Sequence, residues 1–344
     1  MKIPHNKITF DEAEAQAVKD VVASGQWVGG AVMKKTEDNL AWLFDMEHAA
    51  CVGSGLSALR LALLSLGLGS EDEVLIPAYS CVALANAVLS IGAVPVAVDS
   101  VSGVHNICPT RAKENITQKT KAIIAVNTFG QAADIGALKE FGLPVIEDCS
   151  HGFAVKGVST PETLKGDLAI FSFYATKLVA SGEGGAVLSN DKNWIDFCKN
   201  QRDYTDQAPD ATRLNDKMTD IEAALVKVQL GKLQNFLEKR YKAAAYYDAL
   251  FPQEIKPVLT ESRVWYRYCL SLESSANLSD TIESIEVRGV SVKMPVENWL
   301  GSDIENYPNA QKAFKNTLSL PLYPLIKKEE QDYVFEQVKE ILAI

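Results

Sequence analysis

Short apolar runs alternate with helical stretches between about residues 50 and 190. The runs are apolar throughout, rich in β-branched residues and ended by polar ones, as strands buried on both faces are. Strands are therefore predicted at 73–77, 94–99, 121–127, 143–148, 168–173 and 185–189. Helical stretches fill several of the gaps, including 57–66 and 133–141. This alternation predicts an α/β fold, with a mainly parallel sheet sandwiched by helices.

The pattern changes after residue 215. Apolar residues then recur at helical spacing, and Thr219 and Glu222 fit a capping box, so a long helix is predicted at about 219–250. Further elements are predicted as short strands at 267–271 and 290–294 and a closing helix at 329–342. We interpret the chain as two domains, a large one at 1–235 with an N-terminal arm and a smaller α/β one at 236–344.

Composition and charge narrow the range of functions. The 344 residues are 47% apolar and 23% charged, which is typical of a globular protein and excludes disordered and fibrous classes. A net charge of −10 repels nucleic acid and anionic membranes, so neither is expected as a partner. No apolar run is long enough to span a membrane and the N-terminal residues lack a signal-peptide core, so we expect a cytoplasmic protein. The six cysteines and four histidines are scattered, which predicts reduced thiols and no metal site.

The segment 53–59, Gly-Ser-Gly-Leu-Ser-Ala-Leu, is the first candidate for chemistry. Its glycines allow a tight turn, and the free amides where a helix opens favour a phosphate. One alternative is a plain glycine-rich connection. Another is the dinucleotide fingerprint Gly-x-Gly-x-x-Ala, but that motif requires an acidic residue at the end of the next strand, which here ends at Pro77.

Two further segments place polar side chains at strand ends. Asp148 ends a buried strand, where α/β sheets bind ligands, although it could equally cap a helix. His151 would share a helical or turn face with Asp148, or serve a structural role. Lys177 follows the next strand and precedes the glycine-rich turn 181–186; a buried amine there can act as nucleophile and base, whereas the alternative is a surface-loop lysine.

Together, a phosphate turn, a carboxylate and a lysine at strand ends are what an enzyme of pyridoxal 5′-phosphate (PLP) requires. The residues resemble the DegT/DnrJ/StrS family of sugar-nucleotide aminotransferases, which implies the type I PLP-dependent transferase fold. The segments that carry the resemblance, in family order, are 53–59, 76–88, 146–151, 171–177 with 182–185, and 215–218.

The resemblance also implies roles around the cofactor ring. Lys177 is the Schiff-base lysine, and Asp148 pairs with the ring nitrogen and keeps it protonated, so these two are the expected catalytic residues. His151 stands where the family places a Gln or His beside the ring's 3-hydroxyl. Cys81 stands where many members place a stacking aromatic ring and is included among the expected cofactor-binding residues.

Phosphate binding is implied for a second group of residues. Ser57, Ser172 and the amides of Gly55 and Leu56 would hold the phosphate within one subunit. Asn215 resembles the asparagine that reaches the phosphate of the neighbouring subunit. A homodimer with shared active sites is therefore expected.

The resemblance implies transfer of an amino group from an amino acid, glutamate by family analogy, to a nucleotide-linked keto sugar. Segments 200–204 and 294–299 depart from the family pattern, so the sugar itself is not predicted. One alternative is a PLP-dependent aminotransferase with another carbonyl acceptor. A second is a PLP- or sugar-binding regulatory protein with little turnover, and a nicotinamide dehydrogenase is a more distant third.

Overall fold

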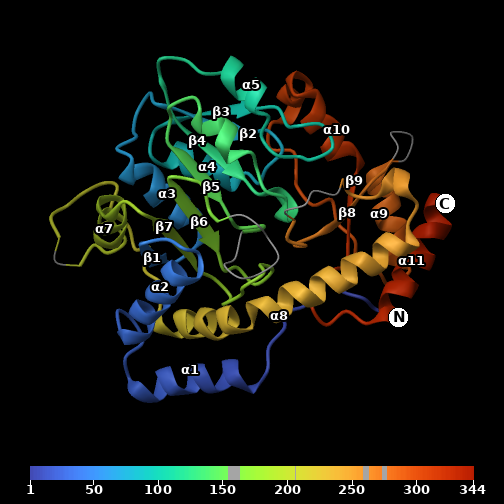
Figure 1. Ribbon diagram of the computed structural model, residues 1–344, viewed down its shortest axis with the longest axis horizontal. Coiled ribbons are helices and arrows are strands. Elements are labelled where there is room, and N and C mark those ends of the chain that lie inside the picture. Colours follow the sequence, from blue (N-terminus) through green and yellow to red (C-terminus); the bar gives the residue numbers. More distant parts are fainter. Residues whose placement is uncertain (154–162, 206, 259–262, 273–276) are drawn as a thin grey trace.

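A seven-stranded sheet forms the centre of the molecule in the computed structural model, which describes residues 1–153, 163–205, 207–258, 263–272 and 277–344 (Figure 1). The strand order is β1-β7-β6-β5-β4-β2-β3, and only β7 runs antiparallel to its neighbours. The strands are β1 His48–Val52, β2 Glu73–Pro77, β3 Val94–Val98, β4 Thr120–Val126, β5 Val145–Asp148, β6 Leu168–Ser172 and β7 Gly185–Ser189. The predicted mainly parallel sheet is confirmed, with β1 as an additional strand.

Helices cover both faces of this sheet. The helices of the molecule, of which α9 and α11 pack with the C-terminal elements instead of this sheet, are α1 Glu12–Ser24, α2 Ala31–Leu43, α3 Gly55–Ser65, α4 Ala83–Ser90, α5 Pro109–Glu114, α6 Ile135–Lys139, α7 Lys192–Gln201, α8 Asp220–Leu250, α9 Leu278–Val287, α10 Pro308–Asn316 and α11 Lys328–Leu342. Along β6, Leu168 and Ile170 pack on the side of α3, α4 and α7, whereas Ala169 and Phe171 pack on the side of α2 and α8. Both faces of the strand are thus buried, which explains why the run is apolar at every position.

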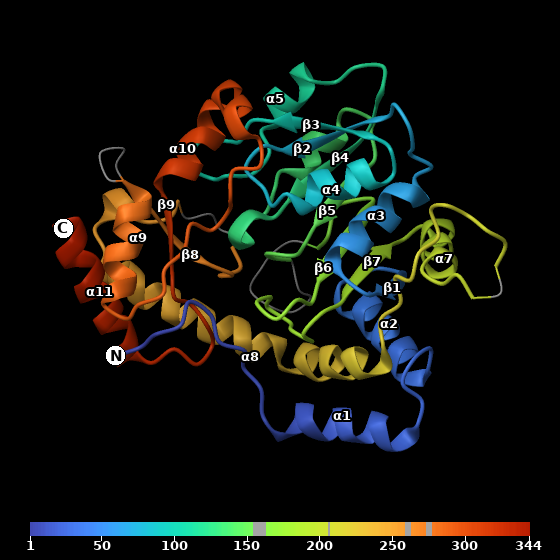
Figure 2. The same cartoon turned by 180° about the vertical axis from the view of Figure 1, so that it is seen from behind.

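The long helix α8 joins this sheet to the C-terminal elements (Figure 2). It begins after Thr219 with the predicted capping box, and it crosses the predicted domain boundary at residue 235 without a break. Its first part packs on α1 and α2, and its last part packs on α11. The division into two domains stays a prediction, because one helix serves both cores.

The C-terminal elements surround a two-stranded antiparallel sheet of β8, Tyr268–Ser271, and β9, Thr317–Leu320. The strand predicted at 267–271 and the closing helix are confirmed. The strand predicted at 290–294 is not formed; Val290 and Lys293 make only isolated bridges, to Ile3 and Ser319. Ile3 is buried in the C-terminal core, so the first residues of the chain pack with its last elements. Both termini accordingly lie near α9 and α11 (Figure 1).

Within the ranges the structure describes, no helix is long and apolar enough to cross a membrane. The same residues contain no cluster of three or more His, Cys, Asp or Glu that could hold a metal ion. All six cysteines are free thiols.

A buried carboxylate on α8 fixes the start of α2. Asp220, only 1% exposed, accepts hydrogen bonds from the backbone N–H groups of Gly30 at 2.7 Å and of Val32 and Met33 at 3.1 Å each. These are amides that a helix start leaves without intrahelical partners. A Cβ at Gly30 would lie 2.7 Å from Asp220 Oδ1, so this close approach requires glycine.

We expect Asp220→Ala to lower the free energy of unfolding by about 3 kcal/mol, because three buried amides lose a charged acceptor. Asp220→Asn should cost less, since one oxygen remains to accept. Urea denaturation followed by circular dichroism measures both variants. The control is Asp38→Ala on the exposed face of α2, which should change the free energy by less than about 0.5 kcal/mol. Equal effects of Asp220→Ala and Asp38→Ala would contradict this account.

Candidate active site

A cavity of about 270 Å³ opens at the carboxyl edge of the sheet. Its walls come from the segments that follow β1, β2, β4, β5 and β6, because these strands are parallel and end at the same edge. Of the site residues predicted from the sequence, those that line the cavity are Gly55, Leu56, Cys81, Asp148, His151, Ser172 and Lys177. The predicted phosphate, ring and lysine segments therefore meet in one cavity.

Lys177 lies on a tight loop between β6 and β7. Its backbone N–H donates to Tyr174 O at 2.8 Å, and Ala175 N–H donates to Gly182 O at 3.1 Å. Gly184 has φ of 126°, a backbone conformation that residues with a side chain rarely adopt, so glycine is required at this turn. The glycine-rich turn thus lets the loop fold back, and it leaves the half-buried Lys177 in the cavity wall.

Asp148 ends β5 and lies at the base of the same cavity. It is 4% exposed, and one oxygen accepts a hydrogen bond from Ser150 N–H at 2.9 Å. Burial raises the pKa of Asp148, and the contacts from Ser150 and the charge of Lys177 oppose that rise. A buried carboxylate of this kind is stabilised by a cationic or protonated partner. The protonated ring nitrogen of PLP fits that requirement.

His151 is held in a stack of rings. Its imidazole lies 4.6 Å from the ring of Tyr266 and 5.9 Å from that of Phe129, with interplanar angles of 15° and 16°. Burial, with the charges of Lys177 and Arg267, holds the pKa of His151 well below its usual value. Its Nδ1 is buried and has no hydrogen-bond partner among the residues that the structure describes. Because His151 lines the cavity, an oxygen of a bound ligand could make the hydrogen bond that Nδ1 lacks.

The predicted phosphate turn is the start of α3. Ser54 caps the helix by accepting from Ser57 N–H at 3.0 Å, which leaves the amides of Gly55 and Leu56 at the open end. A Cβ on Gly55 would lie 2.7 Å from Ser172 Cβ, so glycine allows α3 to approach the end of β6. These amides and the Ser172 hydroxyl together form a cradle suited to a phosphate.

Three residues that were predicted to bind the cofactor do not belong to this phosphate cradle. Ser57 lies outside the cavity lining, and its hydroxyl donates to Asp216 Oδ1 at 2.7 Å. Asn215 is exposed on the surface of this chain. Cys81 lines the cavity beside α4, but its side chain offers no ring for stacking. The cofactor contacts of all three stay predictions.

Tyr266, which the sequence did not reveal, lies behind the cavity lining in contact with Lys177 and His151. It is 5% exposed, and Lys177 Nζ lies 5.4 Å from the centroid of its ring. Burial alone would raise the pKa of Tyr266, but the charges of Lys177 and Arg267 outweigh it and bring this pKa to about 8. Tyr266 comes from the segment that precedes β8, far from Lys177 in the chain. No local spacing could have connected the two residues.

A lysine, a buried carboxylate and a phosphate cradle at one sheet edge define the site of a PLP-dependent aminotransferase of fold type I. The chain belongs to the DegT/DnrJ/EryC1/StrS aminotransferase family, whose model matches residues 9–339. This membership confirms the resemblance seen in the sequence, the enzyme class and the cofactor.

Individual relatives cover nearly the whole chain. A pleiotropic regulatory protein of Geobacillus stearothermophilus is 31% identical over 94% of this chain and 93% of its own. GDP-perosamine synthase of Escherichia coli O157:H7 is 28% identical over 99% of each chain. The pyridoxamine phosphate form of Spr1654 from Streptococcus pneumoniae, 25% identical, has a TM-score of 0.91 and covers 100% of this chain and 98% of its own. The chain is similar to each of them along its full length.

Three part-buried histidines predict how stability depends on pH. Burial and nearby cations lower the pKa of His5 to about 3, that of His105 to about 4 and that of His151 well below 6.5. Below pH 6.5 the unfolded chain therefore binds protons that the folded chain does not, and stability falls as the pH falls. Between pH 6 and 5 the free energy of unfolding should approach a slope of about 4 kcal/mol per pH unit.

Urea denaturation of the cofactor-free protein at several pH values measures this slope. His5→Asn removes one of the three groups, so we expect it to reduce the slope by about one third. His5 lies outside the cavity lining, which keeps this variant independent of the cofactor site. A slope that is unchanged in His5→Asn would show that His5 does not contribute to the pH dependence.

Proposed function

We propose that this enzyme transfers an amino group from glutamate to the keto group of a nucleotide-linked sugar. The observation that carries the proposal is the meeting of Lys177, Asp148 and the start of α3 in one cavity. The similarity to GDP-perosamine synthase supports a nucleotide-linked sugar as the acceptor. The same residues could aminate another carbonyl compound. Recovery of the cofactor with keto-sugar nucleotides distinguishes these two kinds of acceptor.

The residues of the cavity have distinct tasks. PLP, when bound, supplies an electron sink that allows a bond to the amino-bearing carbon to be broken. Lys177 would hold the cofactor through its Nζ between turnovers, and once the amine of the donor displaces it, the freed Nζ would take up and return a proton. Asp148 would pair with the ring nitrogen of the cofactor and keep it protonated, because a positive charge there would stabilise the buried carboxylate.

The remaining contacts orient the cofactor. The amides of Gly55 and Leu56 and the hydroxyl of Ser172 bind the phosphate at the positive end of α3. His151, held flat between Phe129 and Tyr266, offers its vacant Nδ1 to the oxygen on the cofactor ring. Stacking against these two rings fixes the orientation of the imidazole, so Nδ1 can make its hydrogen bond to the cofactor in only one geometry.

A second subunit completes the site in this proposal. The cavity mouth carries exposed apolar side chains, with Leu56 44% and Tyr174 47% exposed, and Val82 close by is 46% exposed. Exposed apolar residues gathered around a site are typical of a covered interface. We propose a homodimer in which Asn215 of each subunit reaches the phosphate held by the other, which its exposure on the surface permits.

A regulatory function without turnover is the second candidate. The similarity to the pleiotropic regulatory protein of Geobacillus stearothermophilus favours it. Lys177 and Asp148 favour catalysis, since a protein that only binds PLP has little need of both. A PLP-loaded protein that reacts with no amino donor would support the regulatory function.

The Lys177→Ala variant tests the catalytic proposal. Without its amine the variant should lose both half-reactions by at least about 10³-fold, since nucleophile and base are removed together. Absorbance should show conversion of the wild-type cofactor to its amino form by glutamate, followed by recovery with keto-sugar nucleotides. Borohydride should fix PLP to the Lys177 peptide in the wild type only. Turnover in Lys177→Ala near the wild-type rate would overturn the assignment.

Mixed dimers test the shared site. Lys177→Ala and Asn215→Ala should each be nearly inactive alone, but a refolded equal mixture should regain about one quarter of wild-type activity. Half of the dimers are then hybrids, and each hybrid contains one intact site. The control mixes Lys177→Ala with Asp148→Asn, whose defects lie in the same subunit's site, so every site keeps one defect and activity stays low. Recovery in that control, or none in the test mixture, would contradict shared sites.

A further inference from the structure

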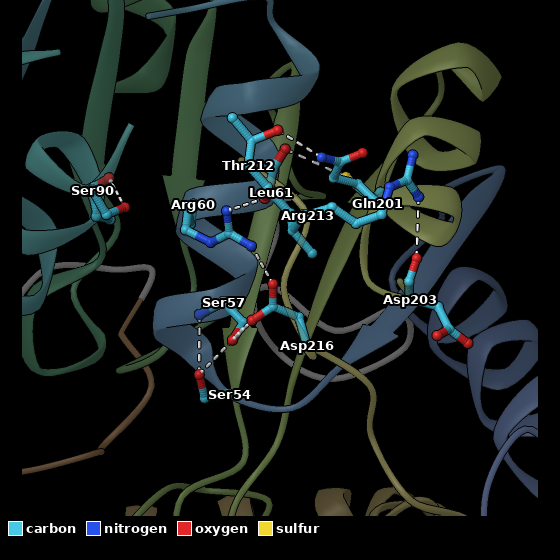
Figure 3. A network of polar contacts seen from close by, with 12 residues as sticks. Ser54, Ser57, Arg60, Leu61, Ser90, Gln201, Asp203, Thr212, Arg213 and Asp216 are labelled. Atoms are coloured by element: carbon cyan, nitrogen blue, oxygen red, sulfur yellow. Dashed lines mark hydrogen bonds and ion pairs between the residues drawn. The ribbon is translucent and has the colours of Figure 1, made fainter. Parts of the chain in front are cut away.

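A buried ion pair lies directly behind the phosphate turn. Arg60, one turn along α3 from Ser57, pairs through its guanidinium with the carboxylate of Asp216 (Figure 3). The two residues are 6% and 7% exposed. Asp216 comes from the segment between α7 and α8, so the pair joins parts of the chain that are far apart in sequence.

Asp216 contacts the phosphate turn at two points. Its Oδ1 accepts the Ser57 hydroxyl at 2.7 Å, and its backbone oxygen accepts Gly53 N–H at 2.7 Å. Arg60 also donates to Thr212 O at 2.7 Å, so it holds the segment 212–216 against α3. The first turn of α3 is thereby fixed from outside the cavity.

This arrangement places the carboxylate of Asp216 next to the start of α3, the proposed phosphate site that Asp216 supports. The N-terminus of a helix attracts negative charge, whether it belongs to a phosphate or to a side chain. Asp216 lies within hydrogen-bond distance of Ser57 in the first turn of α3, so its charge would repel a phosphate bound at Gly55 and Leu56. Arg60 occupies its second oxygen and neutralises the charge.

We propose that Arg60 is a positioning residue for the cofactor phosphate, which acts by neutralising Asp216 and holding it away from the open amides of α3. The inference rests on the proposed function only in requiring a phosphate at this turn. Because Asn215 adjoins Asp216, the same ion pair also fixes the segment that presents Asn215 to the other subunit. The Arg60–Asp216 ion pair thus supports the phosphate turn of its own subunit, and it also supports Asn215, which reaches the site of the other subunit.

The charge argument predicts opposite effects for the two partners. Arg60→Met leaves the Asp216 charge uncompensated, so the dissociation constant of PLP should rise roughly tenfold. Asp216→Asn keeps an acceptor for Ser57 but removes the negative charge, so PLP should bind as tightly as in the wild type or more tightly. The double variant Arg60→Met/Asp216→Asn should restore most of the affinity that Arg60→Met loses.

Equilibrium titration with PLP and with pyridoxal, which lacks the phosphate, separates this role from general damage to the fold. Pyridoxal should bind every variant with the wild-type dissociation constant, because the effect acts on the phosphate. Arg213→Met is the matched control: its guanidinium lies on the same segment and contacts Asn200 and the Asp203 backbone rather than Asp216, so PLP affinity should not change (Figure 3).

Each other outcome overturns the inference. Equal weakening by Arg60→Met and Asp216→Asn would mean that the pair only stabilises the fold, as would a parallel loss of pyridoxal binding. If Arg60→Met does not fold, Arg60→Lys and Asp216→Asn decide the matter, since both must keep wild-type affinity for PLP. Failure of the wild type to bind either PLP or pyridoxal would instead refute the proposed function.

Discussion

The burial of Asp148 at the end of β5 is the constraint around which the site is built. A carboxylate in this position is costly unless a positive or protonated partner faces it. Lys177 enters the same cavity from the next strand, and its charge already acts on Asp148. A protonated ring between the two would satisfy the carboxylate, so the order of strands β5 and β6 in the sheet determines where the cofactor can lie.

Glycines then determine how closely the phosphate cradle approaches that ring. Gly55 allows α3 to contact Ser172 at the end of β6, and Gly184 allows the lysine loop to fold against Met218. A side chain at Gly55 would collide with Ser172, so α3 would have to move outward.

The sequence predicted most of the sheet and several of the side chains that line the cavity, because those signals are local. Asp148 ends a recognisable buried run, Lys177 follows one by a few residues, and Gly55 opens a helix. Tyr266 gave no comparable signal, because its position beside Lys177 depends on how the C-terminal elements pack against the sheet. The strand expected at 290–294 failed for the same reason: its partners are Ile3 and Ser319, which no local pattern connects to it.

The stack of Phe129, His151 and Tyr266 shows how the two parts of the chain depend on each other. Phe129 follows β4 of the large sheet, whereas Tyr266 precedes β8, and His151 lies between them. The imidazole is therefore oriented only when the C-terminal elements are docked on the sheet. A cavity residue held in this way depends on the packing of both cores, since a shift of either core would tilt the imidazole and move its Nδ1.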